Sequence, residues 1–126
     1  MKAVTRTLAA VLAVGVIVPL PAALATSPRT IVKGTCTGNS TAKLKLSPEN
    51  GRIEVEFEVD QNRNGVIWNY KLTRGGVNLA SGAKTTLAPS GSFTARRLVS
   101  NTAGPDTITA RATRRNGEVC TARATL

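Results

Sequence analysis

Six consecutive residues, from Asp60 to Gly65 (DQNRNG), have the side chains that open a calcium-binding loop. Such a loop needs oxygen ligands at alternating positions and a Gly where the chain turns sharply. It also needs a bidentate Glu at its last position, which counting from Asp60 is occupied by Lys71. Lys71 and Arg63 would repel a divalent cation. The stretch is better explained as a polar connection closed by Asn64-Gly65, and the sequence predicts no metal site and no cofactor.

Acid–base and nucleophilic chemistry have little support in this sequence. The chain has no His and only two Cys, so the usual general base and most thiols are missing. Acidic residues alternate at positions 54, 56, 58 and 60, but a catalytic carboxyl pair needs one member kept protonated in a dry pocket. A Ser–Lys pair is formally available in Ser81 or Ser92 with Lys84, although Ser is ordinary in turn segments. The sequence therefore predicts a protein that is not an enzyme.

Positive charge is the more pronounced chemical feature. Lys and Arg number 17 against 7 Asp and Glu, a formal net charge of +10. Four of the arginines cluster in the C-terminal third, namely Arg111, Arg114, Arg115 and Arg123. A basic surface of this kind attracts polyanions such as teichoic acids, acidic polysaccharides or extracellular nucleic acid, or it only keeps the protein in solution. With four aromatic residues in the chain, specific nucleic-acid readout is not expected.

The first 25 residues have the pattern of an export signal. Two basic residues precede an apolar run from Leu8 to Leu20, and Ala23-Leu24-Ala25 supplies the small residues that a signal peptidase reads. The run is shorter than the roughly 20 residues that span a bilayer. We therefore expect a signal peptide over residues 1–25, cleaved after Ala25, and a secreted, extracellular chain over residues 26–126 with no membrane span.

The two cysteines, Cys36 and Cys120, lie near opposite ends of the expected mature chain. An oxidising extracellular compartment favours their pairing. The chain-entropy model gives a ring of this size about 4.5 kcal/mol of stabilisation. The sequence therefore predicts a Cys36–Cys120 disulfide that joins the first and last strands.

The elements that position these residues are predicted to be β-strands. Residues 53–60 alternate apolar and acidic side chains, which is typical of a strand with one buried and one exposed face. Turn signals rich in Gly, Pro and Asn separate similar segments, and none has a helical period. The predicted strands are 30–36, 41–47, 52–60, 66–74, 77–87, 92–99, 106–114 and 118–125.

Two hairpins can be aligned from the sequence. If Asn50-Gly51 is a two-residue turn, apolar residues pair with apolar ones, and Lys45 and Lys43 face Glu56 and Glu58. The acidic stripe is then a solvated, salt-bridged face. If Asn116-Gly117 is also a two-residue turn, Arg114 faces Val119 and Arg111 faces Ala122. This second pairing brings Arg111, Arg115 and Arg123 into one neighbourhood.

Strands of this number and length favour an all-β domain over residues 26–126. We expect an immunoglobulin-like, two-sheet antiparallel β-sandwich of seven to eight strands with Trp68 in its core. A closed up-and-down β-meander, or barrel, is the alternative. In a sandwich, the segment 60–65 crosses from one sheet to the other.

Two segments, EVDQNRNGVIWNYKLTRGG (58–76) and SGSFTARRLVSNTAGPDTITARA (90–112), carry a resemblance to a known group. The sequence resembles uncharacterised small secreted actinobacterial proteins with a predicted immunoglobulin-like β-sandwich. Their shared features are a signal peptide, a strand–DxNRxG–Trp-strand segment, a late AGPD turn and two terminal cysteines. The resemblance implies secretion from a Gram-positive cell and brings no activity with it.

Together these patterns predict a secreted, non-catalytic, monomeric binding module of the cell envelope or extracellular space. Its partner would be an anionic envelope polymer or another protein. One alternative is a secreted inhibitor of an extracellular enzyme, presenting the loop 60–65 or 100–106; a second is a small hydrolase. The expected binding surface comprises Arg111, Arg114, Arg115, Arg123, Asp60, Asn62, Arg63 and Asn64.

Overall fold

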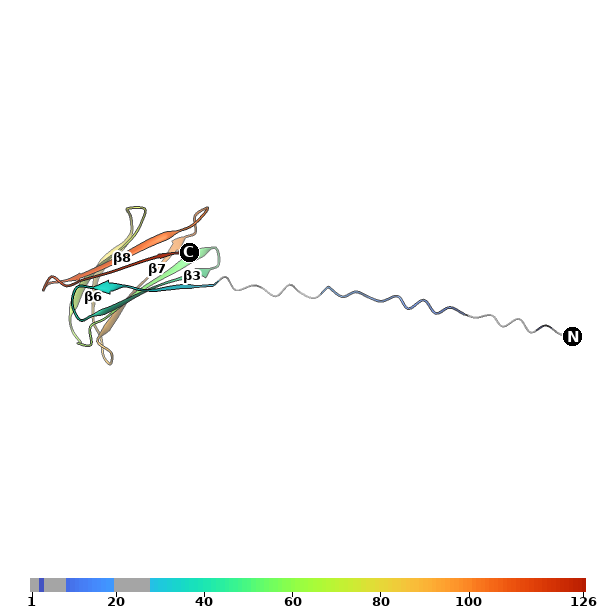
Figure 1. The fold of residues 1–126 in the computed structure, drawn as a ribbon, viewed down its shortest axis with the longest axis horizontal. Coiled ribbons are helices and arrows are strands. Elements are labelled where there is room, and N and C mark those ends of the chain that lie inside the picture. The colour runs from blue at the N-terminus through green and yellow to red at the C-terminus, as the bar shows by residue number, and fades with distance from the viewer. Residues whose placement is uncertain (1–2, 4–8, 20–27) are drawn as a thin grey trace.

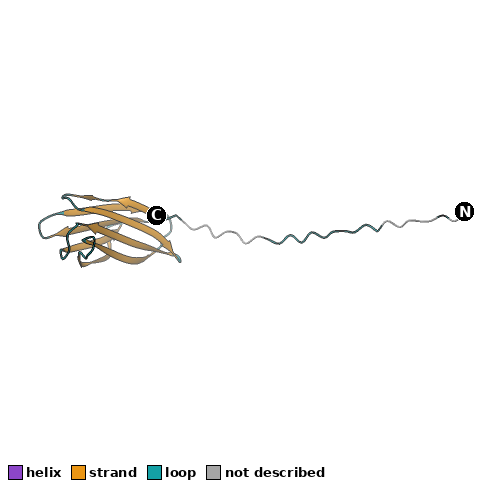
Figure 2. Ribbon diagram, turned by 90° about the horizontal axis from the view of Figure 1, so that it is seen from below, coloured by secondary structure: helices purple, strands orange, loops and turns teal. Residues whose placement is uncertain are grey.

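The computed structural model of the protein describes Ala3, residues 9–19 and residues 28–126. The predicted signal peptide and its cleavage after Ala25 lie largely outside the described residues. From residue 28 onward the chain forms strands joined by turns and loops (Figures 1 and 2). The strands are β1 (Thr30–Lys33), β2 (Thr35–Cys36), β3 (Thr41–Glu49), β4 (Arg52–Asp60), β5 (Ile67–Arg74), β6 (Val77–Thr85), β7 (Ser92–Ser100), β8 (Thr107–Arg114) and β9 (Val119–Thr125).

The strands make two antiparallel sheets that pack face to face. One sheet has four strands in the order β1-β3-β4-β7, and the other has five in the order β2-β9-β8-β5-β6. Each sheet keeps two edge strands, so neither closes on itself. The predicted two-sheet sandwich is therefore confirmed, and the barrel alternative is wrong. The C-terminus lies at the same end of the sandwich as the start of β1 (Figures 1 and 2).

The first predicted strand, 30–36, is in fact two strands that belong to different sheets. The chain changes sheets at Gly34, which donates a backbone hydrogen bond of 2.8 Å to Ala42 O. A Cβ atom at this position would lie 2.5 Å from Thr121 O, closer than any side chain tolerates. Gly34 thus permits the close approach to β9, and this raises the strand count from the expected eight to nine.

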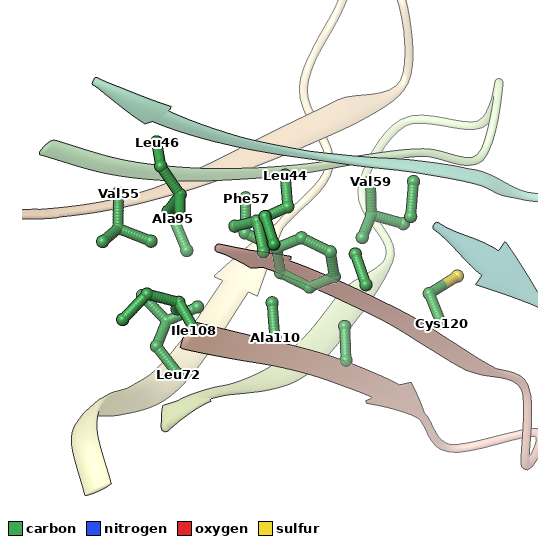
Figure 3. Close-up of a cluster of buried hydrophobic side chains, with 14 of the residues drawn as sticks. Leu44, Leu46, Val55, Phe57, Val59, Leu72, Ala95, Ile108, Ala110 and Cys120 are labelled. Atoms are coloured by element: carbon green, nitrogen blue, oxygen red, sulfur yellow. The ribbon is translucent and has the colours of Figure 1, made fainter. Parts of the chain in front are cut away.

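The hydrophobic core fills the space between the two sheets. On β4 buried residues alternate with more exposed ones along the whole strand, as the sequence pattern predicts. Figure 3 shows Phe57 and Val59 from one sheet and Ile108 and Ala110 from the other pointing into the same cluster. Trp68 is fully buried, as predicted, and its ring centroid lies 6.2 Å from that of Phe93.

The β3–β4 hairpin has the predicted register. Lys45 is opposite Glu56 and Lys43 is opposite Glu58, and each pair forms a salt bridge. Arg96 of the neighbouring β7 adds ion pairs to Glu56 and to Glu54. The hydrogen bond from Lys45 is the main cause that lowers the pKa of Glu56. The acidic stripe is therefore neutralised by basic side chains on both sides.

The predicted disulfide is present. Cys36 of β2 lies directly opposite Cys120 of β9, and their Cα atoms are 4.0 Å apart. Because Cys120 is fully buried, the bond lies on the core side of the five-stranded sheet. It joins the short edge strand β2 to the last strand of the fold.

Candidate functional site: the outer face of the five-stranded sheet

The five-stranded sheet presents exposed basic side chains on its outer face. On β8 the residues Ala110 and Ala112 are buried, so Arg111 between them points away from the core. The same alternation directs Lys71 of β5 outward, and on β9 it directs Arg123 outward between buried alanines. All three cations are exposed.

The sheet register brings these three charges close together. Lys71 lies directly opposite Arg111 across the β5–β8 pair. Arg123 lies opposite Thr109, one row further along the same face. Neighbouring strands are about 4.8 Å apart, and successive outward residues of one strand about 6.6 Å. Like charges directly opposite each other destabilise a sheet, so the Lys71–Arg111 pair is a local cost to the fold.

No Asp or Glu side chain in the described part of the chain lies on this face. The sequence has seven Asp and Glu residues. Two of them, Asp106 and Glu118, are buried. The remaining five belong to β3 and β4 of the other sheet: Glu49, Glu54, Glu56, Glu58 and Asp60. The outer faces of the two sheets therefore differ in charge. On the four-stranded sheet acidic and basic side chains form ion pairs, whereas the charged side chains described on the five-stranded sheet are all basic.

The rest of the cationic face is rich in hydroxyl groups. Two threonine pairs bond across strands, Thr107 to Thr125 at 2.8 Å and Thr35 to Thr121 at 3.3 Å. β-Branched threonine suits a strand and leaves its hydroxyl at the surface. The outward polar residues beside the cations are Thr35, Asn69, Thr73, Ser81, Thr107, Thr109, Thr113, Thr121 and Thr125.

A groove of about 710 Å³ continues this face toward the loops. Ile67 and Asn69 of β5 line one side, and Thr113 with Arg115 lines the other. Ile67 is 61% exposed and gives the groove an apolar patch. Arg115 thus extends the row of cations beyond the end of β8.

The predicted register of the last hairpin is wrong by one residue. Thr113, and not Arg114, lies opposite Val119, and Arg111 faces Thr121 in place of Ala122. The connection is longer than a two-residue turn: Gly117 N donates to Arg114 O, and Arg114 N donates to Glu118 O. Gly117 has a φ of 89°, which fits a turn followed by a glycine bulge. Arg111 and Arg123 therefore share a face in neighbouring rows, and Arg115 occupies the turn.

Arg114 borders the groove beside Arg115, but its side chain packs toward the loop end of the sandwich. Its guanidinium carbon lies 5.7 Å from the centroid of the Trp68 ring, a cation–π contact. Its Nε atom lies 3.1 Å from Glu118 Oε1. These contacts fix the position of the side chain, which keeps only 22% of its surface exposed.

Glu118 is a buried carboxylate that ties the β2–β3 loop to the β8–β9 turn. It accepts hydrogen bonds from the Ser40 backbone N–H at 3.2 Å and from the Ser40 hydroxyl at 2.8 Å. Burial alone would raise its pKa, but the two hydrogen bonds from Ser40 and the charge of Arg114 outweigh that effect, so the pKa of Glu118 is lowered.

Substituting Glu118→Gln is expected to lower the free energy of unfolding at neutral pH by about 2 kcal/mol. Because the pKa of Glu118 is lower in the folded protein than in the unfolded chain, its stabilising contribution is complete above the unfolded pKa. That contribution is lost as the pH falls through the folded pKa, below the usual value of about 4.3. Urea unfolding at several pH values checks this.

The Glu58→Gln variant, which changes a partly exposed residue and loses only the Lys43 ion pair, is the control for this measurement. It is expected to cost less than about 1 kcal/mol at any pH. The difference in free energy of unfolding between the wild type and Glu118→Gln should shrink at low pH. A difference that stays constant from neutral pH down to pH about 3 would contradict the role assigned to this carboxylate.

The segment after Asp60 crosses between the sheets, as predicted, and its polar groups are used within the loop. Asp60 Oδ1 accepts a hydrogen bond of 2.9 Å from Asn62 N. Arg63 O accepts one of 2.6 Å from the Thr86 hydroxyl. A Cβ on Gly91 would lie 2.3 Å from Arg63 N, so the loop packs closely on the 86–91 connection. The side chains of Asn62, Arg63 and Asn64 are exposed at the loop end.

The eight predicted binding residues therefore fall into two groups. Arg111, Arg115 and Arg123 belong to the outer face and its groove, while Asp60, Asn62, Arg63 and Asn64 lie at the loop end. Arg114 borders both the groove and the loop end. Sequence reasoning missed Lys71 as a partner of Arg111, because the β5–β8 pairing joins segments distant in the sequence. Lys71 directly precedes the buried Leu72 on β5, so strand alternation directs its side chain outward. This alternation was the signal in the sequence that could have identified Lys71.

Within the described residues, no group of three or more His, Cys, Asp or Glu side chains is arranged to hold a metal ion. The same part of the chain contains no helix that is long and apolar enough to cross a membrane. No protein-family model matches the sequence, and no curated protein matches it either.

Proposed function

We propose that this protein is a secreted, non-catalytic binding module that holds polyanionic polymers on the outer face of its five-stranded sheet. The observation that carries the proposal is the Lys71–Arg111 pair, with Arg123 in the next row and no acid on that face of the described structure. On the other sheet Lys43 and Lys45 are paired with acids, whereas the cations of this face have no acid beside them in the part of the chain that the structure describes. The unneutralised, mutually repelling arrangement is relieved when an anion binds.

The shape and chemistry of the face support an extended polymer as the ligand. The sheet surface continues into the groove, and its hydroxyl and amide groups can hydrogen-bond to sugar hydroxyls or phosphate oxygens. Trp68 is fully buried and so gives no stacking platform for bases. Charge, and not nucleotide sequence, would select the ligand.

The disulfide supports an extracellular location, because such bonds persist in oxidising compartments. The predicted export signal and the resemblance to secreted actinobacterial proteins support the envelope of a Gram-positive cell. Teichoic acids and acidic polysaccharides are the polymers expected there. We propose that a single copy of the chain is sufficient for binding.

Titration of the purified mature chain with polygalacturonate or teichoic acid, at increasing salt concentration, tests the proposed function. We expect the logarithm of the affinity to fall linearly with the logarithm of salt concentration between about 0.05 and 0.5 M, since bound cations release counterions from a polyanion. Neutral dextran should not bind. Affinity that is independent of salt, or equal for dextran, would overturn the proposal.

A specific observation favours inhibition of an extracellular enzyme as a second candidate. The loop between β7 and β8 is exposed from Asn101 to Pro105, yet its base is held firmly. Asp106 accepts a hydrogen bond of 3.1 Å from Thr102 N, and Arg74 bridges Asp106 and Ser100 O. A rigid exposed loop is the usual feature of a proteinaceous inhibitor. Inhibition of a secreted hydrolase that is lost in an Asp106→Ala variant would support this candidate.

A further inference from the structure

A second, smaller cavity lies at the loop end of the sandwich, beside Arg114. Its volume is about 300 Å³, at the lower end of the range for small-molecule sites. The side chains that line it are all polar: Asn39, Ser40, Gln61, Arg63, Arg114 and Glu118. This cavity is distinct from the groove beside the cationic face, and only Arg114 borders both.

The Arg114 guanidinium is held in place with its terminal donors unused. The Trp68 ring lies beneath it, and Glu118 lies beside Nε. The buried Nε atom makes no hydrogen bond in spite of this proximity. The guanidinium approaches Glu118 through Nε, and both Glu118 oxygens already accept hydrogen bonds from Ser40. A fixed planar fork with free donors is suited to bidentate binding of an oxyanion.

Gln61 and Arg63 add donors to the same cavity. Gln61 Oε1 accepts a hydrogen bond of 2.9 Å from Trp68 Nε1, so its NH₂ group remains available as a donor. The backbone of Arg63 is fixed by Thr86 and by the close approach of Gly91. Arg63 is exposed and lines the cavity, so it adds a second cation to the site.

The charges of the cavity select among anions. Two guanidinium groups and one carboxylate leave a single net positive charge, which matches a monoanion better than a dianionic phosphate monoester. The planar Arg114 fork fits a planar carboxylate. The amides of Gln61 and Asn39 suit hydroxyl groups, and no apolar side chain lines the walls. A carboxylated, hydroxyl-rich ligand of the size of one sugar satisfies all these features.

We infer that this cavity binds a uronic acid residue, with its carboxylate on Arg114 and Arg63 and its hydroxyls on Gln61 and Asn39. The inference rests on the proposed function, which it narrows from polyanions in general to polysaccharides that contain uronic acid. The cationic face would hold the polymer by charge, and the cavity would recognise one sugar unit of it.

The single Trp of the chain provides the readout, because its indole N–H bonds to Gln61 at the cavity wall. In a ¹⁵N-labelled sample, D-glucuronate should move the one indole cross-peak in a saturable way, while D-glucose should not. The Arg63→Gln variant should weaken glucuronate binding by about tenfold, through loss of a charge-assisted hydrogen bond. The matched control Arg97→Gln, at an exposed arginine outside the cavity, should leave it unchanged.

The inference is overturned if glucuronate leaves the cross-peak in place, or if glucose or glycerol phosphate moves it as strongly. Equal behaviour of Arg63→Gln and Arg97→Gln would also overturn it. These results are separable from the proposed function. If the polymer binds in a salt-dependent way but glucuronate does not bind, only the inference about the cavity is wrong. If glucuronate binds but the polymer does not, the proposed function of the cationic face is wrong.

Discussion

Replacement of both Cys36 and Cys120 by Ala is expected to lower the free energy of unfolding by about 4.5 kcal/mol. The disulfide joins residues separated by 84 positions, so its removal frees most of the folded chain in the unfolded state. A domain of this size has a total stability of about 5 to 15 kcal/mol. The melting temperature should therefore fall by about 20 °C.

Loss of the disulfide is also expected to destabilise the edge of the five-stranded sheet locally. The edge strand β2 has only two residues, Thr35 and Cys36, and both pair with β9. Without the bond, β2 is expected to leave β9 and to expose the β9 edge of the cationic sheet. Hydrogen exchange of the amides of β9 should then accelerate more than that of β4, which is central in the other sheet.

Thermal and urea unfolding of the wild type and the double variant, with and without reducing agent, provide the measurement. Reduced wild type should match the double variant, and reducing agent should not change the double variant. A difference of less than about 1 kcal/mol between the oxidised and reduced wild type would contradict the expected contribution of the disulfide.

Neutralising the outer face is expected to have the largest effect on binding. A triple variant with Lys71→Gln, Arg111→Gln and Arg123→Gln should lose about a hundredfold in affinity for polygalacturonate at low salt, since each cation near an anionic surface contributes about 1 kcal/mol. The slope of affinity against salt should also become shallower. The folded state should be as stable as the wild type or more so, because the Lys71–Arg111 repulsion is removed.

The matched control changes the same residue types elsewhere on the surface. Lys33→Gln, Arg52→Gln and Arg97→Gln remove one Lys and two Arg at exposed positions that make no ion pair within the described structure. This triple variant has the same net charge as the first, and its affinity should fall by less than about threefold. Equal losses in the two triple variants would show that total charge, and not the outer face, determines binding.

Local patterns made much of the fold predictable from the sequence. The β3–β4 hairpin could be aligned because its two faces independently indicate the same register. On the buried face apolar residues pair with apolar ones, and on the exposed face Lys45 pairs with Glu56. The cysteine positions and the expected compartment predicted the disulfide. Alternation alone identified Trp68 as a core residue.

The errors arose where backbone contacts or turn type decide the outcome. The division of the first strand depends on Gly34 passing close to Thr121, a contact between distant parts of the chain. The last hairpin was misaligned because Asn116-Gly117 suits both a two-residue turn and a turn with a glycine bulge. Residues that face each other across two strands point to the same side of the sheet. Ala112 and Cys120 both point into the core, so they can pair with each other, and this register excludes the pairing of Arg111 with Ala122.

The candidate site was only partly predictable for the same reason. The sequence shows that Arg111 and Arg123 point outward from neighbouring strands, since hairpin strands are adjacent. It does not show that Lys71 lies opposite Arg111, because β6 and β7 separate β5 from β8 in the sequence, and β7 belongs to the other sheet. Equally, only the folded structure shows that Glu118 is buried against Ser40 and that Arg114 lies over Trp68.

The most direct test of the central claim is to map polymer binding residue by residue. In a titration of the ¹⁵N-labelled protein with short polygalacturonate chains, the amide shifts should concentrate on the outer face around Lys71, Arg111 and Arg123. Residues of the neutralised face, such as Lys43 and Lys45, should not respond. Shifts centred on Lys43 and Lys45, or no shifts at low salt, would contradict the assignment of the cationic face as the binding surface.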